Sequence, residues 1–374
     1  MKKISMCFAF FLLLAGMWLC GGEQVCAQEV QDRLRHANPL MVTVDKKAAP
    51  PESEDSNVVS FDRLLFWHLL YSPMDSLMSV DNEAKSFVAV MMNKTGCVNA
   101  AGIDSERAYE GMDALRELMQ PMPMWQTNLP LLLAALGSDA VNARTAVDTE
   151  YGVYAIGDSV LARDHNWHRG GYGTLTPEEC VRFRSTVGVI RLLDKAYGND
   201  SRKLIYDVKA MGLGLPETFH GESLPSLKLN EDVQHHNAGL AASWEGCLSP
   251  LQVMTFFNGI ANNGKMMAPE TEDEETPQVL MPKMMSGRML NFARKSLRAS
   301  VESGLCKRFA IKGKKVMALT SSIPQRDESR CLLVAIVMAE EQTFMMVTDV
   351  RADLRHEAYN HHVLLFQRML SLPV

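Results

Sequence analysis

The sequence has no excess of basic residues, few aromatic residues and only one long apolar run. Its formal net charge of -6 over 374 residues, with a pI near 6.0, provides no general attraction for phosphate and argues against a nucleic-acid binder. Aromatic residues make up only 7%, but apolar residues reach 47%, which is enough to bury a sizeable core and excludes global disorder. The 25 methionines favour a soft, gap-filling core.

The one long apolar run lies at the N-terminus and is typical of a secretory signal peptide. Lys2 and Lys3 precede the apolar residues 8–19, and residues 25–27 (Val-Cys-Ala) offer a small-residue cleavage site. The run is short for a membrane-spanning helix, which needs about 20 apolar residues. We therefore predict a signal peptide over residues 1–27 and a periplasmic or secreted protein. An uncleaved inner-membrane anchor is the alternative.

Cysteine is sparse beyond the signal, and its spacing excludes the common metal motifs. The five remaining cysteines contain no C-x-x-C pair and no zinc-like cluster, and an odd number cannot all pair within one chain. We interpret them as small buried apolar residues and predict neither a metal site nor a cofactor. They are Cys97, Cys180, Cys247, Cys306 and Cys331.

The pattern of elements predicts an α+β fold. Apolar residues 87–92, a turn at 93–96 and a second apolar stretch from 97 form a hairpin signal. Two helices carry capping-box starts, one at Thr176 that we expect to run to Gly198 and one at Ser249. We expect later strands at 331–338 and 344–347, with helices near 286–303 and 353–371. Such an order indicates a mostly antiparallel sheet flanked by helices, in a domain over 61–374 that follows an N-terminal segment and polar loop at 28–60.

Four stretches, taken in order, resemble the transpeptidase domain of penicillin-binding proteins of the monofunctional, cell-division or elongation type. The hairpin FVAVMMNKTGCVNA resembles that family's opening strands. The segments GGYGTLTPEECVRFRSTVGVIRLLDKAYGND and KLIYDVKAMGLGLPETFHGES resemble the stretches around and after its second motif. The most specific match is SPLQVMTFFNGIANNGKMMAP, which is similar to the family's TPLQ…NAIANNGK run. The resemblance covers roughly residues 87–350 and implies the fold shared with serine β-lactamases.

The resemblance also implies a catalytic apparatus of three motifs. In S-x-x-K the serine is the nucleophile, and the lysine one helical turn on takes its proton. S-x-N helps to move protons and orient the substrate, and K-T-G on the edge strand helps to bind the substrate.

This sequence departs from the family at the first two motifs. Trp125 falls on the nucleophile position and Asn128 on the lysine position. Arg184 and Thr186 fall on the serine and asparagine of the second motif, with Ser185 between them. An indole cannot form an acyl-enzyme, an amide cannot act as a base near neutral pH, and a guanidinium cannot accept a proton.

The third motif is degenerate as well. In the preferred register, Lys314, Lys315 and Val316 fall on K-T-G, so only the first lysine remains. A second register places residues 319–321 (Leu-Thr-Ser) there and loses the lysine too. Without any alignment, no serine precedes a lysine by three positions or an asparagine by two. The one Lys-Thr-Gly, at 94–96, lies in the predicted hairpin turn, where we interpret it as turn chemistry.

These departures predict a member of the family without catalysis. It would act in the cell envelope by binding peptidoglycan or proteins of cell-wall synthesis and division, with membrane contact only if the signal stays uncleaved. Arg184, Ser185, Lys314 and Lys315 are the candidate binding residues, because a basic cleft would suit a carboxylate-bearing stem peptide. Two alternatives stay open: an active D,D-transpeptidase or carboxypeptidase with Ser185 as a displaced nucleophile, and a degenerate secreted paralogue without a cell-wall role.

Histidines offer few further candidates. His165 and His168 flank an Asn-Trp pair and would need a third ligand, such as Asp164, to hold a metal. The adjacent pairs at 235–236 and 361–362 chelate poorly, because neighbouring side chains point in different directions. We predict that both pairs lie on the surface.

Overall fold

The computed structural model describes residues 84–371 except 105–107, 124–127, 230–233, 244, 272–275, 326 and 339–341. Nearly all of them belong to one structural unit, Leu77–Leu370. The predicted signal, the N-terminal segment over 28–60 and Trp125 lie outside the described residues, so these predictions remain predictions.

The opening hairpin forms as the sequence predicts. Strands β1 (Ala84–Met92) and β2 (Val98–Asp104) pair antiparallel. In the turn between them, Asn93 Oδ1 accepts hydrogen bonds from the N–H and the hydroxyl of Thr95, at 2.9 and 2.6 Å. Gly96 adopts a φ of 97°, where a Cβ atom would also lie 2.1 Å from the carbonyl oxygen of Ala268. The Lys-Thr-Gly triplet is therefore a turn that requires its glycine.

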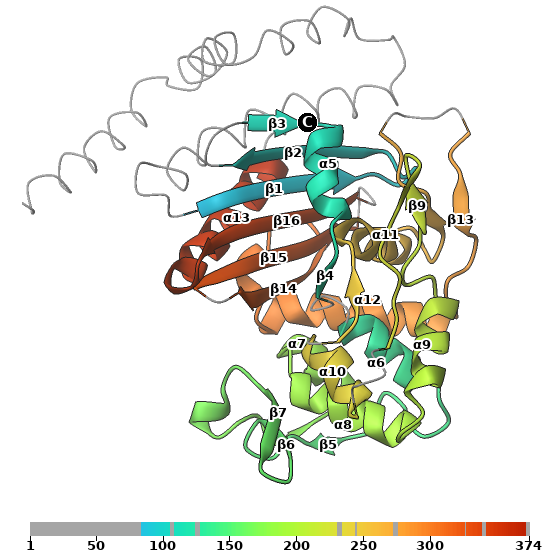
Figure 1. The fold of residues 1–374 in the computed structure, drawn as a ribbon, viewed down its shortest axis with the longest axis vertical. Helices are drawn as coiled ribbons and strands as arrows, with labels where there is room; N and C mark the ends of the chain where they lie inside the picture. Colours follow the sequence, from blue (N-terminus) through green and yellow to red (C-terminus); the bar gives the residue numbers. More distant parts are fainter. Residues whose placement is uncertain are drawn as a thin grey trace, which may run out of the picture. The chain divides into compact units, whose positions relative to one another are not determined.

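Six antiparallel strands make the main sheet, in the order β14-β15-β16-β1-β2-β3 (Figure 1). The strands predicted at 331–338 and 344–347 correspond to the second and third of this order, but the former begins three residues earlier than predicted and the latter is longer at both ends. The remaining strands are β3 (Ala108–Glu110), β14 (Val316–Gln325), β15 (Glu328–Val337) and β16 (Gln342–Arg351). The long strand β14 lies at one edge of the sheet, and the helical part of the molecule follows beyond that edge (Figure 1).

Helices cover both faces of the sheet, as predicted. Successive residues of a strand point to opposite faces. On β16, Met345 packs in the large core with α11 (Pro250–Ala261), whereas Phe344 and Thr348 contact Phe366 and His362 of α13 (Arg355–Ser371). The helices α11 and α13 therefore lie on opposite faces. The prediction that His362 lies on the surface is wrong, because this face of α13 is covered by the sheet and leaves its side chain fully buried.

The helix predicted from Thr176 to Gly198 is two helices. Its start is confirmed: a Glu179 carboxylate oxygen accepts from the N–H of Thr176 at 2.9 Å, which completes the capping box. However, α7 (Pro177–Arg182) stops early, and α8 (Thr186–Tyr197) begins anew. Arg184 between them has a φ of 51°, which cannot continue a right-handed helix.

The second capping box is also confirmed. Ser249 Oγ accepts from the N–H of Gln252 at 3.2 Å, while Gln252 Oε1 accepts from the N–H of Ser249 at 2.9 Å. The other helices are α5 (Met112–Met119), α6 (Asn128–Leu136), α9 (Ser201–Ala210), α10 (His236–Ala242) and α12 (Gly287–Ser303), with 3-10 turns η2 (Trp167–Arg169), η3 (Lys307–Phe309) and η4 (Ala352–Leu354).

Short strand pairs connect these helices. The hairpin β6–β7 stands at the end of the helical part farthest from the sheet in the view of Figure 1. The short strands are β4 (Met122–Pro123), β5 (Val147–Asp148), β6 (Val153–Ile156), β7 (Ser159–Arg163), β8 (Thr174–Leu175), β9 (Thr218–Phe219), β10 (Glu222–Ser223), β11 (Cys247–Leu248), β12 (Met266–Met267) and β13 (Val279–Met281).

The cysteines outside the predicted signal are all free thiols. Four of them are buried, as the sequence analysis expects, but Cys247 is exposed on β11, so its prediction is wrong. Its strand pairs only with the two-residue strand β4, which leaves the side chain uncovered.

Candidate functional site

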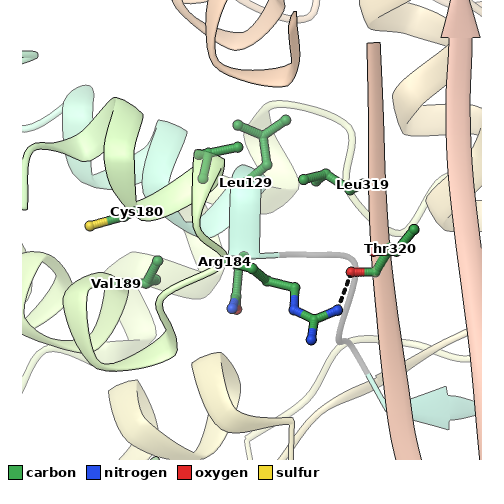
Figure 2. Close-up of a pocket in the computed structure, with 8 residues that line it drawn as sticks. Leu129, Cys180, Arg184, Val189, Leu319 and Thr320 are labelled. Atoms are coloured by element: carbon green, nitrogen blue, oxygen red, sulfur yellow. Dashed lines mark hydrogen bonds between the residues drawn. The ribbon is translucent and has the colours of Figure 1, made fainter. Parts of the chain in front are cut away.

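Arg184, which the sequence resemblance places in the second motif, lies where the helical part meets the edge strand β14. Arg184 leaves the α7–α8 connection and reaches across to β14, where its Nη1 donates to the carbonyl oxygen of Thr320 at 2.5 Å (Figure 2). Residues in sparsely populated backbone conformations persist only where surrounding contacts hold them. This contact ties the left-handed Arg184 to the sheet.

A small cavity lies beside this contact. It measures about 20 Å³, which is room for about one water molecule. Its lining is mostly apolar, and Asn128, Arg184 and Thr320 are its polar residues. The lining residues are Asn128, Leu129, Cys180, Val181, Arg184, Val189, Leu319 and Thr320. A cavity of this size cannot admit a peptide.

Asn128 is the residue that the sequence resemblance places on the family's lysine position. It is the first residue of α6, and its Oδ1 is buried without a hydrogen-bond partner among the described residues. A neutral amide neither accepts nor releases a proton near neutral pH. Asn128 therefore lines the cavity without providing a base.

Ser185 is fully buried and occupied by structural hydrogen bonds. Its Oγ donates to Asp164 Oδ2 at 2.7 Å and accepts from the N–H of Gly188 at 2.9 Å. Asp164 Oδ1 accepts from the N–H of Val187 at 3.1 Å. A carboxylate and a serine thus satisfy the first turn of α8, where N–H groups lack helical partners and negative charge is favoured.

Burial governs the ionisation of the groups in this cluster. It raises the pKa of Asp164, and the hydrogen bonds from Ser185 and Val187 offset part of that rise. Burial also raises the pKa of the Cys180 thiol, so this thiol is no thiolate nucleophile at neutral pH. The pKa of His165 is lowered, first by burial and then by the positive charge of Arg184.

We expect Ser185→Ala to lower the free energy of unfolding by about 1–2 kcal/mol, because it removes a helix cap and leaves Asp164 with one partner fewer. Urea unfolding of the purified protein measures the change. Thr186→Ala, one position into α8, is the matched control and should change stability much less. A Ser185→Ala variant as stable as the wild type would contradict the capping role.

Lys314 and Lys315, the lysines of the preferred third-motif register, take no part in the contact between Arg184 and Thr320. Lys314 and Lys315 precede β14, and Val316 is its first residue. The N–H of Met338, the residue after β15, donates to the carbonyl of Lys315 at 3.0 Å, so by strand alternation the carbonyl of Thr320 points away from the sheet. The structure brings Thr320 to Arg184 and does not bring either lysine into the lining of the cavity.

The histidines and Asp164 have other partners. The Asp164 carboxylate faces α8, whereas His165 Nδ1 lies 2.8 Å from the hydroxyl of Tyr172. The Tyr172 ring stacks on Phe183 at 5.1 Å, so this part of the chain supports the turn that carries Arg184. The sequence analysis treats Asp164 only as a possible metal ligand and does not predict its hydrogen bonds to α8. One signal for a structural role was available, because Asp164 is the only acid between residues 163 and 169.

Fold and site together define a protein of the class that includes serine β-lactamases and penicillin-binding proteins. The family model of the penicillin binding protein transpeptidase domain matches residues 129–362, and the chain belongs to this family. The family acts in synthesis of the bacterial cell wall.

Two solved structures show the same fold. One is the apo transpeptidase domain of penicillin-binding protein 3 from Burkholderia pseudomallei, 17% identical, with a TM-score of 0.66 over 83% of this chain and 92% of that one. The other is a peptidoglycan glycosyltransferase from Burkholderia ambifaria, 16% identical, with a TM-score of 0.64 over 83% of this chain and 93% of that one. No curated protein matches the sequence. Within the described residues, no helix is both long and apolar enough to span a membrane.

Proposed function

We propose that this chain is a non-catalytic transpeptidase-family protein that works in the bacterial cell envelope by binding peptidoglycan or proteins of cell-wall synthesis. The observation that carries the proposal is the contact of Arg184 with Thr320, which fills the site with a guanidinium instead of a serine hydroxyl. The signal peptide predicted over residues 1–27 supports export to the periplasm.

The side chains around this contact support the loss of catalysis. Nucleophilic catalysis needs an accessible hydroxyl or thiol with a base within hydrogen-bond reach. Asn128 supplies only an amide, and the Ser185 hydroxyl is buried and donates to Asp164. Trp125, the residue at the nucleophile position, has no acidic hydroxyl or thiol.

One outward carbonyl of the edge strand is already hydrogen-bonded within the protein. An exposed strand edge offers outward carbonyls to an extended peptide. On β14 the outward carbonyl of Thr320 already accepts from Arg184, so an incoming peptide would have to displace this contact. We infer that residues 319–321 occupy the third-motif position, since Leu319 and Thr320 line the cavity and the two lysines precede the strand.

A fluorescent penicillin tests the loss of catalysis. We expect the purified protein to form no covalent adduct that survives denaturation, while an active penicillin-binding protein in the same assay is labelled. The Ser185→Ala variant distinguishes the alternative. Labelling of the wild type that disappears in this variant would establish Ser185 as a displaced nucleophile and overturn the proposal.

A further inference from the structure

Exposed apolar side chains gather on the segment that precedes α7. Among the described residues, eight large hydrophobic side chains are exposed, and four of them lie between residues 151 and 167. Tyr151, just before β6, is 78% exposed, and Trp167, in η2, is 47% exposed. The other two, Ile156 and Val160, lie on the hairpin β6–β7. Such a concentration on a soluble surface indicates an interaction site.

Two glycines allow the turns that carry Tyr151 and Trp167 to pack closely against each other. A Cβ atom on Gly152 would lie 3.3 Å from the Cα of Trp167, and one on Gly171 would lie 2.4 Å from the backbone nitrogen of Gly152. Both glycines have positive φ angles, 73° and 72°. Tyr151 and Trp167 therefore stand on backbone segments in direct contact, which fixes their spacing before any ligand arrives.

The charge around Trp167 is basic although the protein as a whole is acidic. Between residues 163 and 169 the one acid, Asp164, is buried and bonded to Ser185. Arg163 and Arg169 are exposed and permanently charged. His165 and His168 are exposed as well, but partial burial and the charge of Arg184 lower the pKa of His165 and favour its neutral form.

Exposed acids also lie on the neighbouring hairpins. The Arg163 guanidinium lies 5.1 Å from the centre of the Trp167 ring. Glu150 pairs with Arg191 at 2.6 Å, which leaves Asp148 and Asp158 as the exposed acids of the neighbouring hairpins. We call Tyr151, Arg163, Trp167 and Arg169 the aromatic platform.

We propose that the aromatic platform binds the glycan strands of peptidoglycan together with their carboxylate-bearing stem peptides. The inference deepens the proposed function and rests on its peptidoglycan branch. Indole and phenol rings present a flat apolar face with a polar edge, which suits the apolar face of a sugar ring. Guanidinium groups bind carboxylates through paired hydrogen bonds. In this arrangement the rings contact the sugars and the guanidinium groups bind the carboxylates of the stem peptides. None of the platform residues lines the cavity beside Arg184.

Co-sedimentation with protein-free peptidoglycan sacculi tests the assignment. The pair Tyr151→Ala/Trp167→Ala removes the rings, and the pair Arg163→Gln/Arg169→Gln removes the charges. The matched control is Tyr206→Ala/Arg202→Gln on α9, since Tyr206 is 74% exposed and Arg202 is exposed as well. We expect each platform pair to weaken binding about tenfold or more, equivalent to about 1.4 kcal/mol. The control should bind like the wild type, and thermal unfolding confirms that all variants are folded.

The outcomes separate this inference from the proposed function. If the wild type binds sacculi and both platform pairs bind equally well, the assignment of the surface is wrong, but peptidoglycan binding stands. If the wild type does not bind sacculi, the peptidoglycan branch of the proposed function and this inference both fail. Penicillin labelling is independent of either result and reports on catalysis alone.

Discussion

Replacing Gln252 with alanine should lower the free energy of unfolding by about 4 kcal/mol, because several buried polar groups lose their partner together. Gln252 is fully buried at the start of α11. Its Nε2 donates to the carbonyls of Gly214, Pro216 and Pro225, at 2.7, 3.0 and 3.0 Å. One side chain thus holds the loop that follows α9 against the central helix.

Two further variants separate the causes of this loss. Gln252→Met fills the space with an apolar chain of similar length, so it should recover the cavity cost but not the hydrogen bonds. Ser249→Ala removes the cap of the same helix and should cost about 1 kcal/mol. Urea unfolding gives the free energies, and amide hydrogen exchange should show lost protection in residues 212–227 of the Gln252 variants. A Gln252→Met variant as stable as the wild type would refute the importance of the three carbonyl contacts.

Local signals explain what the sequence predicted well. The capping boxes at Thr176 and Ser249 depend on residues three positions apart, so the sequence alone reveals them. The turn at 93–96 likewise depends on the nearby Asn93 and Gly96. Each of these predictions is confirmed, because no distant contact is needed to determine the conformation.

An unusual residue explains what the sequence prediction missed at Arg184. Local hydrogen bonds close this turn, from the N–H of Arg184 to the carbonyl of Val181 at 3.1 Å and from the N–H of Ser185 to the carbonyl of Cys180 at 2.9 Å. Glycine is the usual residue at such a left-handed helix end, so an arginine there gives no signal in the sequence. The third motif, in contrast, depends on distant contacts. Lys314 and Lys315 precede β14, so the start of this strand at Val316 decides which side chains lie near Arg184.

Two asparagines near the end of α11 connect this helix to the opening hairpin. Asn258 of α11 donates from Nδ2 to the carbonyl of Asn93 at 3.0 Å, and Asn262 does the same to Lys94 at 2.7 Å. These contacts hold the opening hairpin against the central helix, within the most specific family match in the sequence. The contacts of these two asparagines are therefore in place, whereas Ser185, which the resemblance places in the second motif, serves as a helix cap.

We expect the protein to lose about 2 kcal/mol of stability as the pH falls from 6.5 to 4.5, through His362 alone. Burial lowers the pKa of His362 to about 3. The unfolded chain binds a proton near the ordinary value of 6.5, but the folded protein does not, so protonation favours unfolding. The contribution is fully present above pH 6.5 and declines toward pH 3. His362 Nε2 lies 2.7 Å from the hydroxyl of Thr348, with the rings of Phe87 and Tyr359 beside it, which leaves no room to solvate an imidazolium.

The His362→Gln variant isolates this contribution. Glutamine can keep a hydrogen bond to Thr348 but does not titrate, so the difference in unfolding free energy between wild type and variant should shrink as the pH falls. Asp164 contributes a slope of the opposite sign, because burial raises its pKa, but this slope is common to both proteins and cancels. His361→Gln, on the neighbouring and more exposed residue, should retain the wild-type slope. Parallel stability curves for wild type and His362→Gln between pH 4.5 and 6.5 would show that His362 binds protons alike in the folded and the unfolded protein, contrary to its buried and neutral environment.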